Sequence, residues 1–342
     1  MPFYKKVLIC IVLLIMSYVL WKLLKRRSEI LSMAKKEGIT FFSSPETELA
    51  TLKTDGDVKI QNTNIKHYNL PLKEYCIKAS YNSAYTGRYV NTDMVKYVIS
   101  RGCRVLDFEV YLLDGKPCVG VSTDDTITTL DTENSILLDR IFNTIMTNAF
   151  TSIGCPNSDD PLFINLRIKS NDPSVYKEVA KVVEVDLRPK LHVRPVTKET
   201  KLSEIMGKVV LMIDKTVNYD YKKLTKCQPN EKHCFDLTSY VTLETGSEDL
   251  FLVKYGDIVN QYGIPIHIMN DNKHTNIQNM LFIKPDYDTA NDDNPNFLDL
   301  VKEYGSQIVP YSFYHKDSEL VEYEKFFDDH KTAFVPLSIA LR

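Results

Sequence analysis

The sequence predicts an α/β protein with a mainly parallel sheet, closed into a (β/α)8 barrel, and one transmembrane helix ahead of the barrel. From Leu70 onward, short apolar runs rich in β-branched and aromatic residues alternate with helical stretches, which is typical of a parallel sheet. About eight such strand–helix units fit this region, and that number favours a barrel over an open sheet. A long apolar stretch near the N-terminus predicts the membrane helix.

Residues 7–24 are the predicted membrane helix. They read VLICIVLLIMSYVLWKLL, and their one charge, Lys22, lies near one end. As a helix this stretch is about 27 Å long, close to the hydrocarbon thickness of a bilayer. A cleaved signal peptide is the alternative, but it requires a shorter apolar core and a small-residue cleavage site, whereas this core runs directly into KLLKRR. The basic excess after the helix predicts a single-pass protein with a cytosolic C-terminal domain.

The remaining elements are predicted in chain order. The predicted domains are an anchor with its flanks at 1–27, a polar linker at 28–68 and a barrel at 69–342, whose halves at 69–215 and 240–342 are joined by a polar connection at 216–239. The predicted strands are CIKA (76–79), RVLDFEVYL (104–112), KPCVGV (116–121), LFINLRI (162–168), VVLMIDK (209–215), IPIHIMN (264–270), LFIKP (281–285) and QIVPYSF (307–313). The predicted helices lie within 91–102, 133–150, 172–185 and 294–305. In the first helix, Asn91 or Thr92 is the expected N-cap and Gly102 the expected end.

Charge and cysteine content exclude several classes of protein. The net charge of −3 and the pI of about 6.2 give no global basic field, so no nucleic-acid partner is expected. The seven cysteines are odd in number and form no CxxC pair, which argues against a disulfide framework or a zinc ribbon. We interpret them as reduced thiols in a reducing compartment. Cys227 and Cys234 with His233 remain an alternative metal site, although a four-ligand set is not visible.

Several blocks of the sequence resemble the X and Y regions of phosphatidylinositol-specific phospholipase C. In the X-like half, the blocks are LPLKEYCIKASYNSAYTG (70–87), RGCRVLDFEVYLLDGKP (101–117), PLFINLRI (161–168) and MGKVVLMIDK (206–215). In the Y-like half, they are DTANDDNPNF (288–297), GSQIVPYSF (305–313) and AFVPLSIALR (333–342). The resemblance implies a distorted TIM barrel of the phospholipase C type, in two halves. The segments SYNSAYTG and RGCRVLDFEV also resemble phospholipase-like proteins of large DNA viruses. This resemblance implies a location in a viral or host membrane.

The family's chemistry needs a base for the inositol 2-hydroxyl, an acid for the diacylglycerol oxygen and, in the eukaryotic branch, calcium held by Asn, Glu, Asp and Glu. The resemblance places the two family histidines on Tyr81 and Val121. It places the calcium-ligand positions on Asn82, Asp107, Glu109 and Arg167. It places the substrate-pocket positions on Met212, Asp214, Lys215 and Phe282. Both catalytic histidines are therefore lost, and the calcium site is degenerate.

The residue types support that conclusion independently. Asp107 and Glu109 share one face of a predicted strand because strand side chains alternate. Arg167 on a nearby strand favours a buried ion pair with these carboxylates over a metal site. Tyr81 cannot act as a base near neutral pH, since its reference pKa is about 10, although it could donate a hydrogen bond. Val121 can do no proton chemistry. Because the calcium site that the resemblance implies is degenerate, no cofactor is expected.

These observations predict a membrane-anchored phospholipase C-like protein that is catalytically inactive and binds a phosphoinositide headgroup or a protein partner. The first alternative is an active phosphoric diester hydrolase that uses Asp107 and Glu109 by a non-standard mechanism. Glycerophosphodiester phosphodiesterases are the nearest such family, but the H-R-G start that they need is absent. The second alternative is a structural viral membrane protein.

Overall fold

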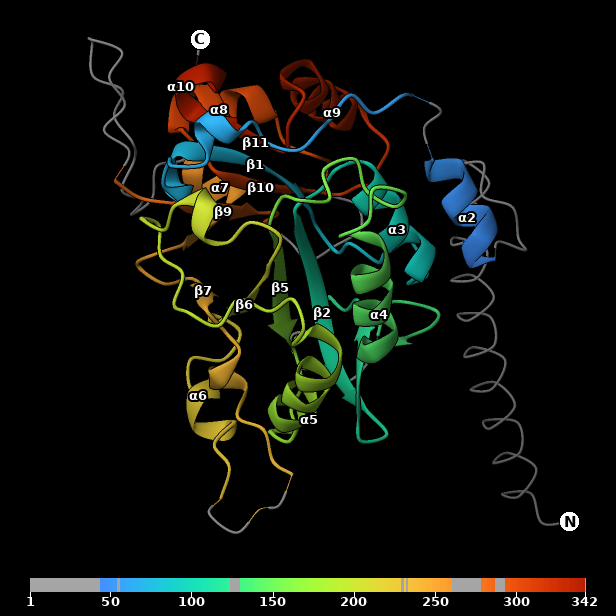
Figure 1. Cartoon of the computed structure of the whole chain (residues 1–342). Helices are drawn as coiled ribbons and strands as arrows, with labels where there is room; N and C mark the ends of the chain where they lie inside the picture. The colour runs from blue at the N-terminus through green and yellow to red at the C-terminus, as the bar shows by residue number, and fades with distance from the viewer. Residues whose placement is uncertain are drawn as a thin grey trace, which may run out of the picture. The chain divides into compact units, whose positions relative to one another are not determined.

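A computed structural model describes residues 44–53, 56–123, 130–228, 231, 233–259, 278–286 and 293–341 (Figure 1). The chain divides into two compact units, Met1–Glu48 and Leu49–Arg342. Only residues 44–48 of the first unit are described, and they include the start of helix α2 (Pro45–Leu52). The predicted domain boundaries remain predictions.

The second unit is built on eight parallel strands in one nearly closed barrel. Their order is β7-β6-β5-β2-β1-β10-β9-β8. Their bounds are β1 (Tyr75–Ser80), β2 (Val105–Leu113), β5 (Leu162–Ile168), β6 (Val209–Asp214), β7 (Leu243–Thr245), β8 (Phe251–Lys254), β9 (Leu281–Lys284) and β10 (Ile308–Tyr311). Three shorter antiparallel strands lie off this path: β11 (Phe334–Pro336) pairs with β1, β3 (Lys116–Gly120) pairs with β2, and β4 (Ile136–Leu137) pairs with β3. Every predicted strand in the described part of the chain is confirmed; the one at 264–270 lies outside it.

One connection departs from the predicted strand–helix alternation. Strands β7 and β8, at the two ends of the sheet path, are joined by residues 246–250 alone, with no helix between them. Gly246 makes this turn possible: its φ is 87°, and a Cβ there would lie 2.5 Å from Thr216 Cγ2. Its N–H donates to the Leu250 carbonyl at 2.8 Å.

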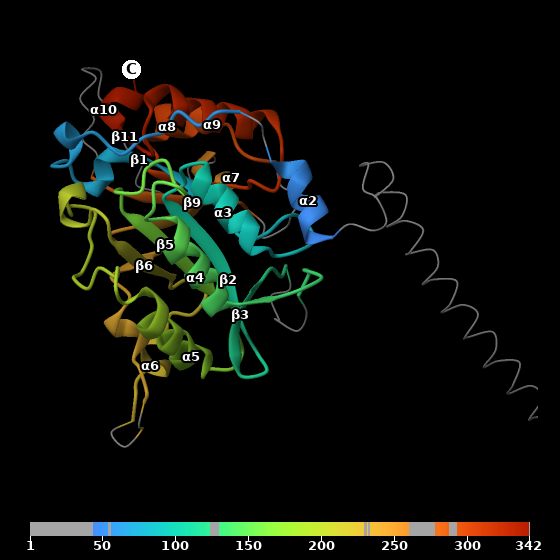
Figure 2. The ribbon, with the colours of Figure 1, turned by 45° about the vertical axis from the view of Figure 1, so that its right-hand side comes forward.

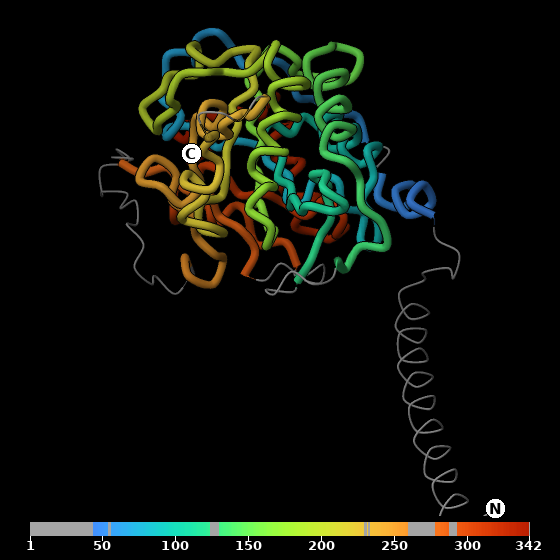
Figure 3. Tube along the Cα trace, turned by 90° about the horizontal axis from the view of Figure 1, so that it is seen from below, coloured from blue at the N-terminus to red at the C-terminus, as the bar shows by residue number. Residues whose placement is uncertain are grey.

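Helices cover the outside of the barrel. Their bounds are α3 (Thr92–Ser100), α4 (Leu138–Asn148), α5 (Val175–Val182), α6 (Tyr221–Leu224), α7 (Tyr255–Val259), α8 (Phe297–Tyr304), α9 (Ser318–His330) and α10 (Leu337–Ala340). Helices α3, α4 and α5 pack in sequence along one flank, and the green coil of α4 lies beside the yellow-green coil of α5 in Figure 3. Helices α8, α9 and α10 gather beside β1 and β11, away from α5 and α6 (Figure 2). All four predicted helices are present.

Local sequence accounts for the best defined of these helices. The Asn91 side chain accepts the Asp93 N–H at 2.8 Å and caps α3, as predicted. The chain leaves α3 through Gly102, whose φ is 82°. A Cβ at Gly102 would lie 2.7 Å from Ile60 Cδ1, so this position also requires glycine for packing.

The predicted single-pass membrane location is contradicted. No helix in the described part of the chain is long and apolar enough to cross a bilayer. The stretch at 7–24, on which that prediction depended, lies outside the described residues.

Candidate catalytic and calcium-binding site

The candidate site is built on two neighbouring strands, β2 and β5. Their parallel register pairs Asp107 with Asn165 and Glu109 with Arg167. Asp107 and Glu109 are both fully buried, and Arg167 is 1% exposed. Arg167 is the last residue but one of β5, and Glu109 pairs with it, so these side chains lie near the carboxyl end of β5, the end at which sites of such barrels are found.

Arg167 lies between the acidic groups and contacts all of them. Its Nη2 is 2.8 Å from Asp107 Oδ2, and its Nη1 is 2.8 Å from Glu109 Oε1. Its Nη2 also donates to Asn82 Oδ1 at 2.5 Å. The structure therefore confirms the predicted ion pair between Arg167 and the two carboxylates.

Other groups occupy the remaining carboxylate positions. Asp107 Oδ1 accepts the Asn165 amide at 2.8 Å. Glu109 Oε2 accepts the Tyr111 hydroxyl at 2.5 Å and the Ser122 N–H at 3.0 Å, and the Lys169 ammonium lies 3.2 Å from Glu109 Oε1. None of these partners was predicted from the sequence. Because side chains alternate along a strand, Asn165 and Arg167 share one face of β5, and this signal could have identified Asn165. The contacts of Tyr111 and Ser122 depend on how β3 pairs with β2.

Tyr81 and Val121, the residues predicted to stand at the positions of the family histidines, are both buried. The Tyr81 ring lies 4.4 Å from Arg167 Cζ, a cation–π contact. Val121 follows β3 and is 3% exposed. The space between Asn82, Glu109 and Val121 is too small for a water molecule. These side chains thus leave no room for water beside Glu109, and the match of Tyr81 and Val121 to the family histidines stays a prediction.

The predicted substrate-pocket positions offer little positive charge. Met212 and Phe282 are buried apolar side chains on β6 and β9. Asp214, at the end of β6, accepts the Thr216 N–H at 2.9 Å and hydroxyl at 2.6 Å. Burial raises the pKa of Asp214, an effect that Thr216 and the charge of Lys284 oppose. Lys215 is the cationic member of this set and is half-buried. The roles of these four residues remain predictions.

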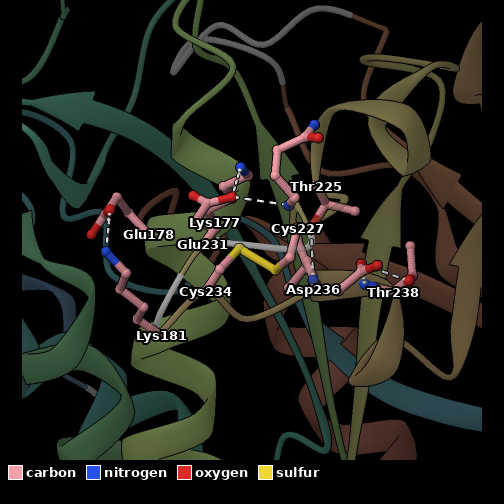
Figure 4. Close-up of a disulfide and its surroundings, with 11 residues drawn as sticks. Lys177, Glu178, Lys181, Thr225, Cys227, Glu231, Cys234, Asp236 and Thr238 are labelled. Carbon is pink, nitrogen blue, oxygen red and sulfur yellow. Dashed lines mark hydrogen bonds and ion pairs between the residues drawn. A yellow bond between two sulfur atoms is a disulfide. The ribbon is translucent and has the colours of Figure 1, made fainter.

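Cysteine and histidine chemistry lies elsewhere. Cys227 and Cys234 form a disulfide (Figure 4), so the interpretation of all cysteines as reduced thiols is wrong, and these two sulfurs are not free metal ligands. The sequence analysis also missed His315, whose Nε2 lies 3.1 Å from Asp293 Oδ1 and 3.7 Å from Asp317 Oδ2. Asp317 caps α9 by accepting the Leu320 N–H at 2.7 Å, so its carboxylate has a structural role.

Comparisons with known proteins agree with this architecture. Residues 68–215 match the family "Phosphatidylinositol-specific phospholipase C, X domain", whereas no curated protein matches the sequence. PLC21 of S. officinalis superposes with a TM-score of 0.58 at 14% identity, over 83% of this chain and 39% of that one. PLC21 of L. pealei gives 0.57 at 13% identity, over 85% of this chain and 40% of that one.

The chain thus spans about two fifths of the length of those two structures, and at such identity the likeness shows the fold alone. The similarity to proteins of large DNA viruses stays a prediction. Residues 68–215 thus match the X domain of phosphatidylinositol-specific phospholipase C, and the barrel, which carries the acidic cluster on β2, is similar in fold to the two PLC21 structures.

Proposed function

We propose that this barrel is catalytically silent and acts by binding, with a phosphoinositide headgroup or a protein as its ligand. The observation that carries the proposal is the buried guanidinium of Arg167 between Asp107 and Glu109. An enzyme of this family would need a metal ion and proton-transfer groups at that place.

The site holds no group suited to remove the proton of an inositol hydroxyl. A general base works best with a pKa near the operating pH. Tyr81 has a reference pKa of about 10, and a cation against its ring face does not turn it into an acceptor at neutral pH. The two carboxylates are bound to Arg167, Asn165, Tyr111 and Ser122, so their lone pairs are already used.

The same residues do not fit calcium. Calcium takes six to eight oxygen ligands at about 2.3–2.6 Å. Here Asn82, Asp107 and Glu109 direct oxygens toward a guanidinium instead. A divalent cation would have to displace Arg167, and the displaced charge would then be buried without a partner. We derive no catalytic step through calcium for this chain.

Because the cluster is closed, a ligand has to be recognised by the outer parts of the barrel mouth. Sedimentation with vesicles that contain phosphatidylinositol or its phosphorylated forms, compared with phosphatidylcholine vesicles, tests headgroup binding. Sedimentation with the inositol lipids supports a headgroup, and its absence supports a protein ligand.

Catalytic silence is tested by a phosphatidylinositol cleavage assay and calorimetric calcium titration of the wild type and of Arg167→Glu. The wild type should show neither cleavage nor micromolar calcium binding. Arg167→Glu rebuilds the fourth ligand position beside Asn82, Asp107 and Glu109, so a folded variant should bind calcium weakly. It should not gain turnover, because Tyr81 and Val121 are unchanged. Calcium-stimulated cleavage by the wild type that is lost in Asp107→Asn would refute the proposal.

A further inference from the structure

A cationic groove lies on the outside of the barrel, where α3 ends and the chain leaves α4. Helices α3 and α4 lie side by side (Figures 1 and 2), and the carboxyl ends of both line a cavity of about 430 Å³. That volume is in the range of small ligand sites. The groove shares no lining residue with the candidate site described above. Its lining includes Lys53, Val58, Lys96, Tyr97, Arg101 and Ile153.

The described residues that line this groove include three cations and no carboxylate. Two of the cations, Lys53 and Lys96, are exposed. Lys96 is paired with Asp93 at 2.7 Å, but both side chains are about half exposed, and such ion pairs contribute little. The groove therefore has a positive potential, and an anionic occupant is complementary to it.

The third cation, Arg101, lies at the floor of the groove and is 6% exposed. Its Nε is 2.6 Å from Glu324 Oε1, and its Nη1 donates to the Gly56 carbonyl at 2.8 Å. Lys78 Nζ lies 3.7 Å from the same oxygen of Glu324. One carboxylate thus serves two buried cations here, so the floor does not cancel the charge of the two exposed lysines.

An apolar side chain lies beside these cations. Ile153 is 99% exposed. It belongs to a tight turn in which the Gly154 and Cys155 N–H groups both donate to the Thr151 carbonyl, at 3.1 and 3.0 Å. A Cβ at Gly154 would lie 2.7 Å from the Asn148 carbonyl oxygen, so glycine lets this turn pack closely on the end of α4. The fold therefore holds Ile153 in solvent at a fixed place on the groove, where covering it would be favourable.

The depth of the groove favours a peptide over a lipid surface. A bilayer surface can contact the exposed lysines and Ile153, but Arg101 is recessed, and only a narrow ligand can bring a carboxylate to it. We infer that the groove is a docking site for an acidic peptide segment of a partner protein, with an aliphatic side chain placed against Ile153. Carboxylates of that segment pair with the two lysines and approach the guanidinium. The site does not depend on whether the barrel binds or cleaves a lipid.

Fluorescence anisotropy of the fluorescein-labelled peptide EELEE, titrated with the full chain, tests the charges. The wild type should bind the peptide, and Lys53→Glu/Lys96→Glu should bind it about tenfold more weakly, because two attractions become repulsions. The control Lys116→Glu/Lys302→Glu makes the same charge change at two exposed lysines outside the groove and should bind like the wild type. No binding by the wild type, or an equal loss in both double variants, would overturn the proposal.

A second experiment tests the apolar contact and the lipid alternative. The peptide EEGEE, which lacks the leucine, should bind the wild type several-fold more weakly than EELEE. Ile153→Ser should remove that difference without weakening the binding of EEGEE, and a preference for leucine that survives in this variant would refute the contact. Sedimentation with phosphatidylserine vesicles is measured on the same variants. Vesicle binding that falls in Lys53→Glu/Lys96→Glu, when the wild type binds neither peptide, would overturn the proposal in favour of a lipid surface.

Discussion

The guanidinium of Arg167 touches Asn82, Asp107 and Glu109, and all four side chains are buried. Desolvating each charge costs several kcal/mol, and the pairs offset that cost only with good geometry and with the remaining lone pairs satisfied. Asn165, Tyr111 and Ser122 satisfy those lone pairs here. The residue types and the alternation of side chains along a strand were enough to predict the ion pair. The partners that satisfy the remaining lone pairs depend on strand register, which cannot be read from the sequence.

Removing the cation should therefore be costly. Replacing Arg167 by Met leaves Asp107 buried without a cation and Glu109 with Lys169 alone, and we expect a loss of about 3–5 kcal/mol in unfolding free energy. Urea denaturation near neutral pH measures it. The matched control is Arg188→Met, whose exposed pair with Glu184 should contribute little. If Arg167→Met were as stable as the wild type, the carboxyl groups of Asp107 and Glu109 would not both be ionised beside Arg167.

Asp214 gives a pH-dependent prediction. Its Oδ2 is buried without a hydrogen-bond partner, and burial raises its pKa above 3.8. The folded state then holds the proton at higher pH than the unfolded state, so this group lowers stability as pH rises from about 3.8 through the folded pKa. Asp214→Asn should remove that loss. In urea titrations, the unfolding free energy of Asp214→Asn relative to that of the wild type should increase between acidic and neutral pH. A difference between the two that does not change with pH would contradict a raised pKa for Asp214.

Among the secondary structure elements, α9 was not predicted from the sequence. Its many charged residues make the spacing of the apolar positions that face the barrel hard to recognise. Leu320, Tyr323 and Phe327 are buried, and the Tyr323 hydroxyl donates to the Ala79 carbonyl at 3.0 Å. Glu324 on the same helix lies 2.6 Å from Arg101 Nε and 3.7 Å from Lys78 Nζ. The helix is thus fastened to β1 and to the end of α3 by both apolar and ionic contacts.

The ionic contact of α9 can be tested with a near-isosteric change. Glu324→Gln leaves Lys78 and Arg101 buried without their counter-charge, so we expect a loss of about 3 kcal/mol in unfolding free energy. Glu322→Gln, one of the exposed residues of the same helix, should stay within about 0.5 kcal/mol of the wild type. Equal stabilities of the two variants would show that the buried charges have other compensation.

Over the whole molecule, the halves at 69–215 and 240–342 pair with each other along two seams, each a boundary where a strand of one half pairs with strands of the other. Strand β1 pairs with β10 and β11, and β6 pairs with β7. Cutting the chain between its halves would expose strand edges on both sides of each seam, and unpaired edges are unstable in solution. Closure therefore makes each half dependent on the other.

We expect fragments 69–215 and 240–342 to lack a cooperative thermal transition when expressed separately, whereas the full chain should unfold in one transition. Circular dichroism melts and amide proton dispersion measure this. Mixing the two fragments is the control, because a restored transition would show that both are intact. A sharp transition from either half alone would contradict the single barrel.

The sequence by itself determined many of the strands and helices, the resemblance to phospholipase C blocks, and the ion pair of Arg167 with Asp107 and Glu109, because periodicity and block order are local properties of the chain. It did not predict β7, β8 or α9. Only the tertiary structure decided which groups satisfy Asp107 and Glu109, that residues 246–250 alone join β7 to β8, and that Cys227 and Cys234 are bonded. These features depend on strand register and on the spatial proximity of segments, and neither is encoded in the spacing of residues along the chain. The closed site follows for the same reason: the charge of Arg167 is visible in the sequence, but its position between two carboxylates exists only in the folded barrel.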